Sequence, residues 1–290
     1  MINCLENACD AAPLYSVSDQ DGCRHTLWAI TESEVIEQVQ TIFAEKSIYI
    51  ADGHHRYTTS LQLRELMRQR HGSVETSSPF DYTMMYLCGM EDEGLSVLPT
   101  HRLVRIPYVA TVDSIVSRLM ESFDVEELKN GSRESLIAEV LGRMEEHAEA
   151  TTLGFYHTID DRCFLLRVKN GIMEQVCSGK HPKSLQDLDV VVLSELVLEC
   201  SLDLTTDKCE KDGLINYFAD PDEALDAAVK ETAVEDGPSP VLFLMNATLV
   251  EQVQRIADEG LVMPHKSTYF YPKVLTGLVI NKLVDTETIK

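Results

Sequence analysis

The sequence predicts a mixed α/β fold, in which short strands alternate with helices. Apolar runs such as residues 82–90 and 240–245 lie between stretches whose apolar residues recur at three- and four-residue intervals. The run IYIA at 48–51 leads directly into DGHHRY at 52–57, which indicates a strand, a tight glycine turn and a helix. A hydrophobic content of 44% over 290 residues supports an ordered core, in one large domain or two smaller ones.

The first third of the chain is expected to contain several short elements. Thr31 and Glu34 have the spacing of a capping box, which predicts a helix from about Glu32. The helix after the DGHHRY turn is predicted to reach about Arg70, with an apolar face formed by Tyr57, Leu61, Leu63, Leu66 and Met67. The other expected elements are strands at 24–30, 48–51 and 95–98, a polar loop at 73–79 and a buried strand at 82–90.

The rest of the chain continues the alternation. Asp160-Asp161 predicts the turn of a hairpin. Thr248 and Glu251 repeat the capping-box spacing before a helix that ends near Gly260. The expected elements are helices at 112–123, 133–147 and 187–200, hairpin strands at 152–157 and 163–168, and a buried strand at 240–245. The segment 220–236, with seven acidic residues and one lysine, predicts a solvated helix face and loop.

Charge excludes several classes of partner. The chain has 48 acidic residues and 25 Lys and Arg, which gives a formal net charge of -23. Such a surface repels DNA, RNA and anionic lipid, because non-specific nucleic-acid binding requires clustered cations. We therefore expect a small-molecule substrate and neither a nucleic-acid nor a membrane partner, while the oligomeric state stays open.

The cysteines and the N-terminal residues indicate a reducing, cytoplasmic location. Eight cysteines contain no Cys-x-x-Cys pair and no spacing typical of a zinc site, so they are expected to be ordinary thiols. The first residues, MINCLENACD, have neither the cationic start nor the apolar stretch of a signal peptide.

The DGHHRY turn is the first candidate site, and an anion is its expected ligand. A helix N-terminus presents N–H groups and a partial positive charge. Gly53, His54, His55 and Arg56 add imidazoles and a guanidinium, which favours phosphate. Asp52 either stabilises the turn, holds Mg²⁺ or acts as a general base.

The segment MPHKSTYFYPK at 263–273 is the second candidate site. Two prolines bracket it, so a rigid loop is expected. Lys266, Ser267 and Thr268 supply an ammonium and two hydroxyls, a suitable cradle for phosphate oxygens, although neither a P-loop nor a dinucleotide fingerprint is present. We expect His55, Arg56, Lys266 and Ser267 to line one pocket.

Other basic residues are weaker candidates for phosphate binding. His101-Arg102 and Asp207-Lys208 could each be a surface ion pair instead. The remaining phosphate-binding candidate is Lys273. The isolated histidines are read as structural or solvent-facing: His25, His71, His147, His157 and His181.

Five motifs in order resemble the domain-of-unknown-function 1015 family of bacteria and archaea: GCRHTLW, IADGHHRY, LPTHRLV, TTDK and MPHKSTYFYPK. The resemblance covers about residues 13–283. It implies a single family domain over 1–290 that lacks an N-terminal part, because family members are usually longer. A possible sub-division is 1–108, 109–182 and 183–290.

The DGHHRY turn is also similar to the signature of the ParB/sulfiredoxin superfamily, whose turn at a helix start binds phosphate. This resemblance implies a ParB/sulfiredoxin-like core with additional strands and helices. His54 occupies the position of the sulfiredoxin cysteine, and the acidic balance disfavours the DNA-binding role of ParB. The resemblance therefore favours the free-serine kinase branch.

The sequence thus favours a kinase that phosphorylates free serine or a similar hydroxyl compound. Phosphoryl transfer needs alignment and charge neutralisation more than covalent help. The expected catalytic residues are Asp52, His55 and Lys266, and the donor is ATP, ADP or pyrophosphate, with Mg²⁺ as the candidate metal. A phosphoserine phosphatase and a non-catalytic nucleotide- or phosphometabolite-binding module are the alternatives.

Overall fold

The chain forms two units in a computed structural model, which describes residues 5, 9, 12–20, 22–71, 78–147, 151–232 and 239–283. Unit 1 comprises Met1–Cys88 and Pro272–Lys290, and unit 2 comprises Gly89–Tyr271. The predicted sub-divisions at 108 and 182 fall inside unit 2, and the single family domain stays a prediction. Most of the polar loop predicted at 73–79 lies outside the described residues.

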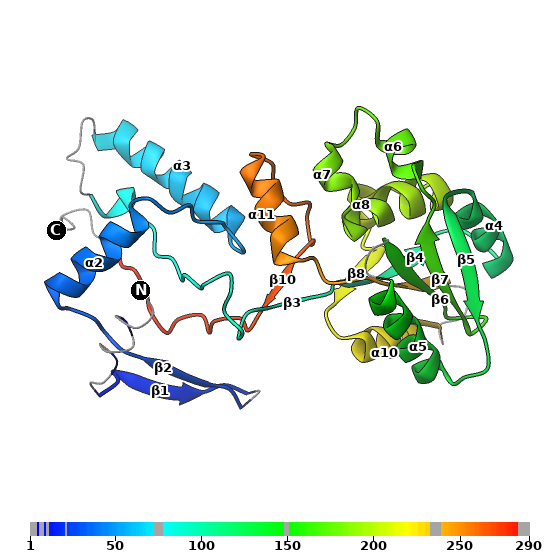
Figure 1. Cartoon of the computed structure of the whole chain (residues 1–290), viewed down its shortest axis with the longest axis horizontal. Helices are drawn as coiled ribbons and strands as arrows, with labels where there is room; N and C mark the ends of the chain where they lie inside the picture. The colour runs from blue at the N-terminus through cyan, green and yellow to red at the C-terminus, as the bar shows by residue number, and fades with distance from the viewer. Residues whose placement is uncertain are drawn as a thin grey trace. The chain divides into compact units, whose positions relative to one another are not determined.

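Unit 1 contains a hairpin and two longer helices (Figure 1). The helices predicted from about Glu32 and after Gly53 are confirmed, and the strand predicted at 24–30 is confirmed as far as Leu27. The elements of unit 1 are β1 (Tyr15–Ser18), β2 (Arg24–Leu27), α2 (Ser33–Phe43), α3 (His54–His71) and the 3₁₀ turn η1 (Pro79–Asp81).

Two predicted strands of unit 1 are wrong, because residues 48–51 and 82–90 form no regular element. A strand needs a neighbouring strand for its ladder hydrogen bonds, and the sheets formed by the described residues include neither run. The apolar side chains of the second run are exposed rather than buried, and Tyr86 is 71% exposed. Strand propensity is therefore not sufficient here without a pairing partner.

The capping box predicted at Thr31 and Glu34 is also wrong. Helix α2 begins one residue later than expected, with Glu32 at its N-cap and no side-chain cap hydrogen bond. The Glu32 carboxylate instead accepts from the Thr31 backbone N–H at 3.1 Å.

Unit 2 is built on a six-stranded sheet whose neighbouring strands are all antiparallel. The spatial order of the strands is β5-β7-β6-β9-β4-β8. The strands are β4 (His101–Ile106), β5 (Phe123–Leu128), β6 (Thr152–His157), β7 (Arg162–Val168), β8 (Ile215–Phe218) and β9 (Ser239–Leu244). The central strands are almost continuously apolar because both faces of the sheet are buried.

Helices cover both faces of this sheet (Figure 1). On one face Val104 and Phe243 pack with apolar residues of α4 and the π-helical segment η2. On the other face Leu103 and Leu242 pack with α5 and α10. The helices of unit 2 are α4 (Val112–Ser122), α5 (Arg133–Glu146), α6 (Ile172–Cys177), α7 (Lys183–Gln186), α8 (Asp189–Val192), η2 (Leu193–Ser201), α9 (Thr206–Lys211), α10 (Pro221–Thr232) and α11 (Val250–Asp258). The predicted mixed α/β fold class is confirmed.

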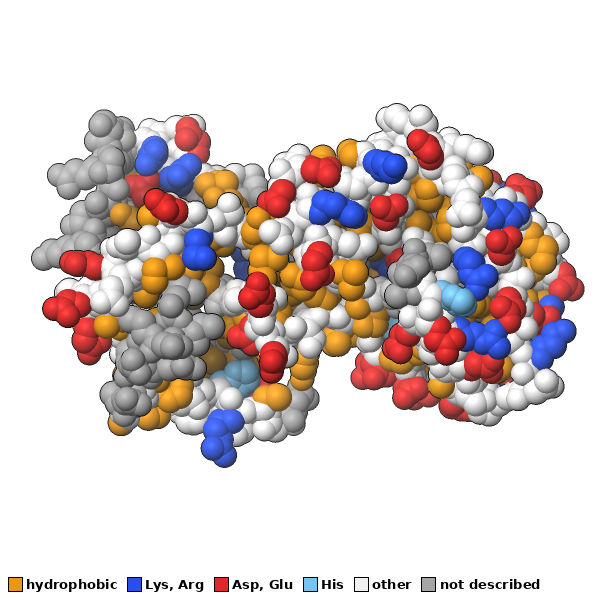
Figure 2. Space-filling model, in the orientation of Figure 1, with side chains coloured by type: hydrophobic (Ala, Val, Ile, Leu, Met, Phe, Trp, Pro, Cys, Tyr) orange, Lys and Arg blue, Asp and Glu red, His pale blue; other side chains and the backbone are white. Residues whose placement is uncertain are grey.

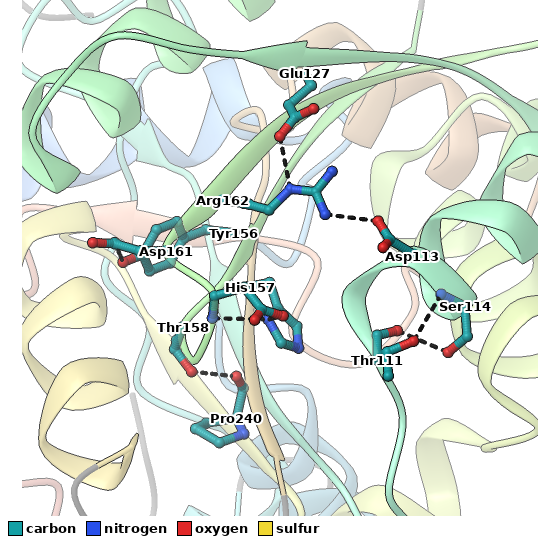
Figure 3. A network of polar contacts seen from close by, with 11 residues as sticks. Thr111, Asp113, Ser114, Glu127, Tyr156, His157, Thr158, Asp161, Arg162 and Pro240 are labelled. Carbon is teal, nitrogen blue, oxygen red and sulfur yellow. Dashed lines mark hydrogen bonds and ion pairs between the residues drawn. The ribbon is translucent and has the colours of Figure 1, made fainter.

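The hairpin predicted through Asp160-Asp161 is confirmed as β6 and β7, and Figure 3 shows the polar contacts around its turn. Arg162 donates from Nε to Glu127 and from Nη1 to Asp113, each at 2.7 Å. Tyr156 donates its hydroxyl to Asp161. These contacts tie the turn to β5 and α4, so we assign them a structural role.

The loop that contains Lys266 is partly a strand, contrary to the prediction for 263–273. Residues Tyr269–Tyr271 form β10, which pairs with β3 (Ser96–Leu98) in an antiparallel ladder. The capping box predicted at Thr248 and Glu251 is wrong as well. The N-cap of α11 is Leu249, one residue later than predicted, and its N–H donates to the Gln252 side chain at 2.9 Å, while the Thr248 hydroxyl donates to the Ser267 carbonyl at 2.7 Å.

The described surface matches the acidic composition. On the face that Figure 2 shows, Asp and Glu side chains are interspersed with Lys and Arg side chains, and the described basic residues form no continuous stripe. Within the described part of the chain, no helix combines the length and apolar character needed to cross a membrane.

Candidate functional site

A cavity of about 190 Å³ lies in unit 2 beside the η2 face of the sheet. It is lined by Arg102 on β4, residues of α8 and η2, Thr206 and Asp207 on α9, Ile215 and Tyr217 on β8, His181 ahead of α7, and Pro264 and His265 ahead of β10. Three of the sequence motifs therefore supply residues to one cavity: LPTHRLV, TTDK and MPHKSTYFYPK.

Arg102 is a buried cation at this cavity, with only 4% of its surface exposed. Side chains alternate along a strand, so Arg102 lies on the same face of β4 as Val104, which packs against η2. Its Nη1 and Nη2 donate to the carbonyls of Thr100 and Lys266 at 2.7 and 3.1 Å. Among the described residues, no carboxylate lies within ion-pair distance of the guanidinium. The predicted surface ion pair is therefore wrong for Arg102.

Burial lowers the pKa of Arg102 to about 10, because the charged form loses its hydration. The guanidinium still carries its charge at neutral pH. It has five N–H donors, and two of them bond to the carbonyls of Thr100 and Lys266. The remaining donors are available to an anion in the cavity.

The ring of Tyr217 lies close to Arg102 and to a second cation, Lys266. The guanidinium carbon of Arg102 is 5.6 Å from the centroid of the Tyr217 ring, and Lys266 Nζ is 5.7 Å from it. The Tyr217 hydroxyl donates to Glu210 at 2.6 Å, and His265 Nδ1 lies 2.8 Å from the same Glu210 oxygen. The Glu210 carboxylate thus lies close to both cations, and the buried Asp189 carboxylate also acts electrostatically on Arg102.

The backbone of Lys266 has an uncommon left-handed conformation, with φ of +56°. Residues with a Cβ adopt this region at some cost, and such strain often occurs at functional sites. Its carbonyl accepts from Arg102, so the same residue fixes the guanidinium and contributes the second charge.

The cavity lining also contains a carboxylate and an imidazole. His181 Nε2 lies 2.8 Å from Glu195 Oε1, and Lys180 Nζ lies 2.9 Å from Glu195 Oε2. The hydroxyls of Ser194 and Thr206, two further lining residues, are 2.8 Å apart. The Glu195 carboxylate is therefore bound by both the His181 imidazole and the Lys180 ammonium, and two hydroxyls lie in the same lining.

Other predicted residues lie outside the cavity lining. His101 faces the opposite side of β4, is fully buried, and accepts from the Met245 N–H at 3.1 Å. Burial lowers its pKa to about 4, so it is neutral at physiological pH. The Ser267 hydroxyl donates to the Pro264 carbonyl. The residues Lys266, Ser267, Thr268 and Lys208 are absent from the described lining, although Lys266 Nζ lies near the ring of the lining residue Tyr217. The expected surface ion pair of His101 is wrong, since the residue is buried in the sheet.

The DGHHRY turn belongs to unit 1 and forms its own polar cluster. Gly53 has φ of +88°, and a Cβ there would approach Arg56 Nη2 to 2.9 Å, so the guanidinium folds back over a position that requires glycine. Asp52 accepts from the Gly53 N–H at 2.7 Å and from Lys273 Nζ at 2.9 Å. His54 and His55 are exposed at the start of α3.

The hydrogen bond from Lys273 lowers the pKa of Asp52 below 3.8. Asp52 is therefore an ionised carboxylate and a weak base at neutral pH. Arg56 and Lys266 belong to different units, so the expectation that they share one pocket stays a prediction.

Sequence reasoning missed four residues of the unit 2 site: His181, Glu195, Glu210 and Tyr217. Glu195 had a usable signal, because it is a charged residue among the apolar residues at the start of η2. Glu210 and Tyr217 had none, since an exposed glutamate and a strand tyrosine are common in any soluble protein. His181 was read as structural because nothing in its local sequence indicates a ligand.

Comparisons with known proteins identify a family but no activity. The family model described as "Protein of unknown function (DUF1015)" matches residues 2–191. No curated protein matches the chain. One similar solved structure is a conserved hypothetical protein from Pyrococcus furiosus, with 15% identity, 81% of each chain covered and a TM-score of 0.35. Another is a mutant free serine kinase in complex with ADP, with 15% identity, 83% of this chain and 81% of that chain covered, and a TM-score of 0.33.

Proposed function

The chain belongs to the DUF1015 family of proteins of unknown function, and we propose that it is a phosphate-handling enzyme of small-molecule metabolism. Its proposed activity is phosphoryl transfer to the hydroxyl of serine or a similar compound. The observation that carries this proposal is the buried Arg102, which lines a cavity and has no carboxylate within ion-pair distance among the described residues.

A buried guanidinium without a carboxylate is costly, since removing an ion from water costs several kcal/mol after relaxation. Two backbone carbonyls offset part of this cost for Arg102. An anionic ligand would offset more. The planar fork of arginine binds phosphate or carboxylate oxygens through two parallel hydrogen bonds, and Lys266 adds a mobile point charge.

The size of the cavity favours a small metabolite. Pockets for drug-sized ligands have volumes of roughly 300–1,000 Å³. The unit 2 cavity has about 190 Å³, which suits a compound such as serine or phosphoserine better than a whole nucleotide.

This arrangement provides what phosphoryl transfer requires. Negative charge spreads over the transferred oxygens, and preorganised cations stabilise it. We assign this role to Arg102 and Lys266. The DGHHRY turn of unit 1, with Arg56, His55 and the helix start, stays a separate candidate for anion binding and is assigned no step here.

Magnesium does not fit Asp52 in its present contacts. The carboxylate is hydrogen-bonded to Lys273 and lies 3.7 Å from Arg56, so two cations already neutralise it. Among the described residues, no group of three His, Cys, Asp or Glu side chains gathers around a common point. No step of the proposed reaction is assigned to a metal at Asp52.

The activity can be tested directly. The protein is incubated with serine and with ATP, ADP or pyrophosphate, with and without Mg²⁺, and phosphoserine is followed by ³¹P NMR and mass spectrometry. Phosphoserine formation supports the kinase, and phosphate release from added phosphoserine supports a phosphatase instead. Binding of phosphoserine without turnover would reduce the proposal to a phosphometabolite-binding module.

A further inference from the structure

His181 and Glu195 form an imidazole–carboxylate pair in the wall of the cavity. Glu195 is almost completely buried, with 7% of its side chain exposed, whereas His181 is partly open. The Gln186 side chain donates to the His181 carbonyl at 2.9 Å, which also anchors the loop that carries the imidazole. The position of His181 is therefore fixed by a hydrogen bond to its backbone carbonyl and by the contact of its Nε2 with Glu195.

The carboxylate determines which imidazole nitrogen carries the proton. An ionised carboxylate only accepts hydrogen bonds, so His181 Nε2 must donate to Glu195 at 2.8 Å. In a neutral imidazole the other nitrogen, Nδ1, then has a free lone pair and acts as an acceptor. Glu195 therefore makes His181 a base through Nδ1.

Glu195 stays ionised although it is buried. Burial by itself would raise its pKa, but the hydrogen bonds from His181 and Lys180 outweigh that effect and hold the pKa below its ordinary value. Glu195 lies in the π-helical segment η2, and π-helical turns occur frequently at functional sites. A buried glutamate in an apolar helix is difficult to explain by packing alone, because burying a carboxylate is unfavourable.

We propose that His181 is the general base of the unit 2 cavity and that Glu195 positions it. This inference rests on the proposed phosphotransferase function. His181 suits the role better than Asp52, because the hydrogen bond from Lys273 makes Asp52 a weak base. Arg102 and His181 line the same cavity, so Arg102 would bind the anionic group while His181 takes the proton of the acceptor hydroxyl.

The proposed step conserves atoms and electrons. The acceptor O–H bond breaks, and its proton passes to His181 Nδ1 while the oxygen forms a bond to the phosphorus of a phosphoanhydride donor. The bond between that phosphorus and the bridging oxygen breaks, and its electron pair leaves with the oxygen of the donor. The imidazolium that results is stabilised by Glu195 and returns its proton to water.

The test compares His181 variants in serine phosphorylation with the donor that the wild-type protein uses. His181→Gln should reduce kcat by about 10²–10⁴-fold with little change in KM, as expected for a lost general base. In His181→Gly, added imidazole should restore part of the rate, which a merely structural histidine would not show. His147→Gln, at an exposed histidine after α5, is the matched control and should retain wild-type kcat.

Glu195 is tested as a positioning residue. Glu195→Gln keeps the shape of the side chain but can present an amide donor to His181, which removes the preference for the Nε2-protonated form. We expect kcat to fall by about 10-fold or more at constant KM. A change in KM alone would assign Glu195 to substrate binding and would overturn its positioning role.

The outcomes separate the two proposals. Wild-type phosphorylation of serine together with unchanged kcat in His181→Gln, or a loss that imidazole does not rescue, overturns the role of His181 and leaves the proposed function intact. Absence of phosphoserine with all three donors overturns the proposed function, and the role of His181 fails with it.

Discussion

Replacing Arg102 by methionine tests the central claim that the cavity binds an anion. Methionine retains a long flexible chain in the buried position but removes the charge and all five donors. The carbonyls of Thr100 and Lys266 lose hydrogen bonds of 2.7 and 3.1 Å. Hydrogen bonds from charged groups contribute about 1.5–3 kcal/mol each, but burying the guanidinium costs several kcal/mol in the folded state. The two effects oppose each other, so the variant should remain folded.

Ligand binding should respond much more strongly. One charge-assisted hydrogen bond to a phosphate oxygen is worth about 1.5–3 kcal/mol, which corresponds to about a 10–150-fold increase in Kd. A bidentate contact from Arg102 would lose about twice that free energy. Lys266 retains its charge in this variant, so binding should be weakened rather than abolished.

Calorimetric titration with phosphoserine and with pyrophosphate measures the effect, and melting curves with and without each ligand provide a second readout. Arg143→Met is the matched control. Arg143 lies on α5, which covers the opposite face of the sheet, and its ion pairs with Glu126 and Glu139 are at the surface. Binding by Arg102→Met within about twofold of wild type, or equal losses in both variants, would refute the reasoning.

Contacts in unit 2 give three further predictions. Asp189→Asn should raise the thermal midpoint near pH 8 but not near pH 4. Burial of the carboxyl group raises the pKa of Asp189 to about 6 in the folded state. The contribution of this group to the free energy of unfolding is therefore fully present below pH 3.8 and falls by up to about 3 kcal/mol as the pH rises through about 6. Melting curves across this range check it, and a difference independent of pH would contradict it. Gly154→Ala should destabilise by about 1–3 kcal/mol in urea unfolding, because the new Cβ would lie 2.9 Å from Leu244 Cβ. Gly142→Ala, with no atom within 4 Å in helix α5, should instead stabilise by about 0.5–1 kcal/mol, and equal effects at both glycines would disprove the packing argument. Lys266→Met should leave the melting temperature unchanged but slow phosphoryl transfer by about 10²–10³-fold, and wild-type turnover would exclude this lysine from the mechanism.

Several elements of unit 2 were predictable because their signals are local, whereas the strands β4, β5 and β8 were not predicted. The hairpin at 152–168 combines two apolar runs with an Asp-Asp turn, and residues 112–122 have an amphipathic period and a Thr111 cap. The strands predicted at 48–51 and 82–90 failed because a strand exists only with a partner. Apolar, β-prone composition is a local property, whereas pairing depends on residues far away in the sequence.

The site shows the same division between local and distant information. The motifs identified Arg102 and Lys266 as candidates, but the contact that joins them spans 164 residues. It exists because β3 and β10 pair with Leu98 opposite Tyr269 and Val97 opposite Phe270. On one side this ladder ends at Leu98, which two residues separate from β4, and on the other it begins immediately after the Lys-Ser-Thr loop. The two motifs therefore meet through a backbone ladder whose register no local pattern encodes, and the Lys266 carbonyl reaches Arg102 as a direct consequence.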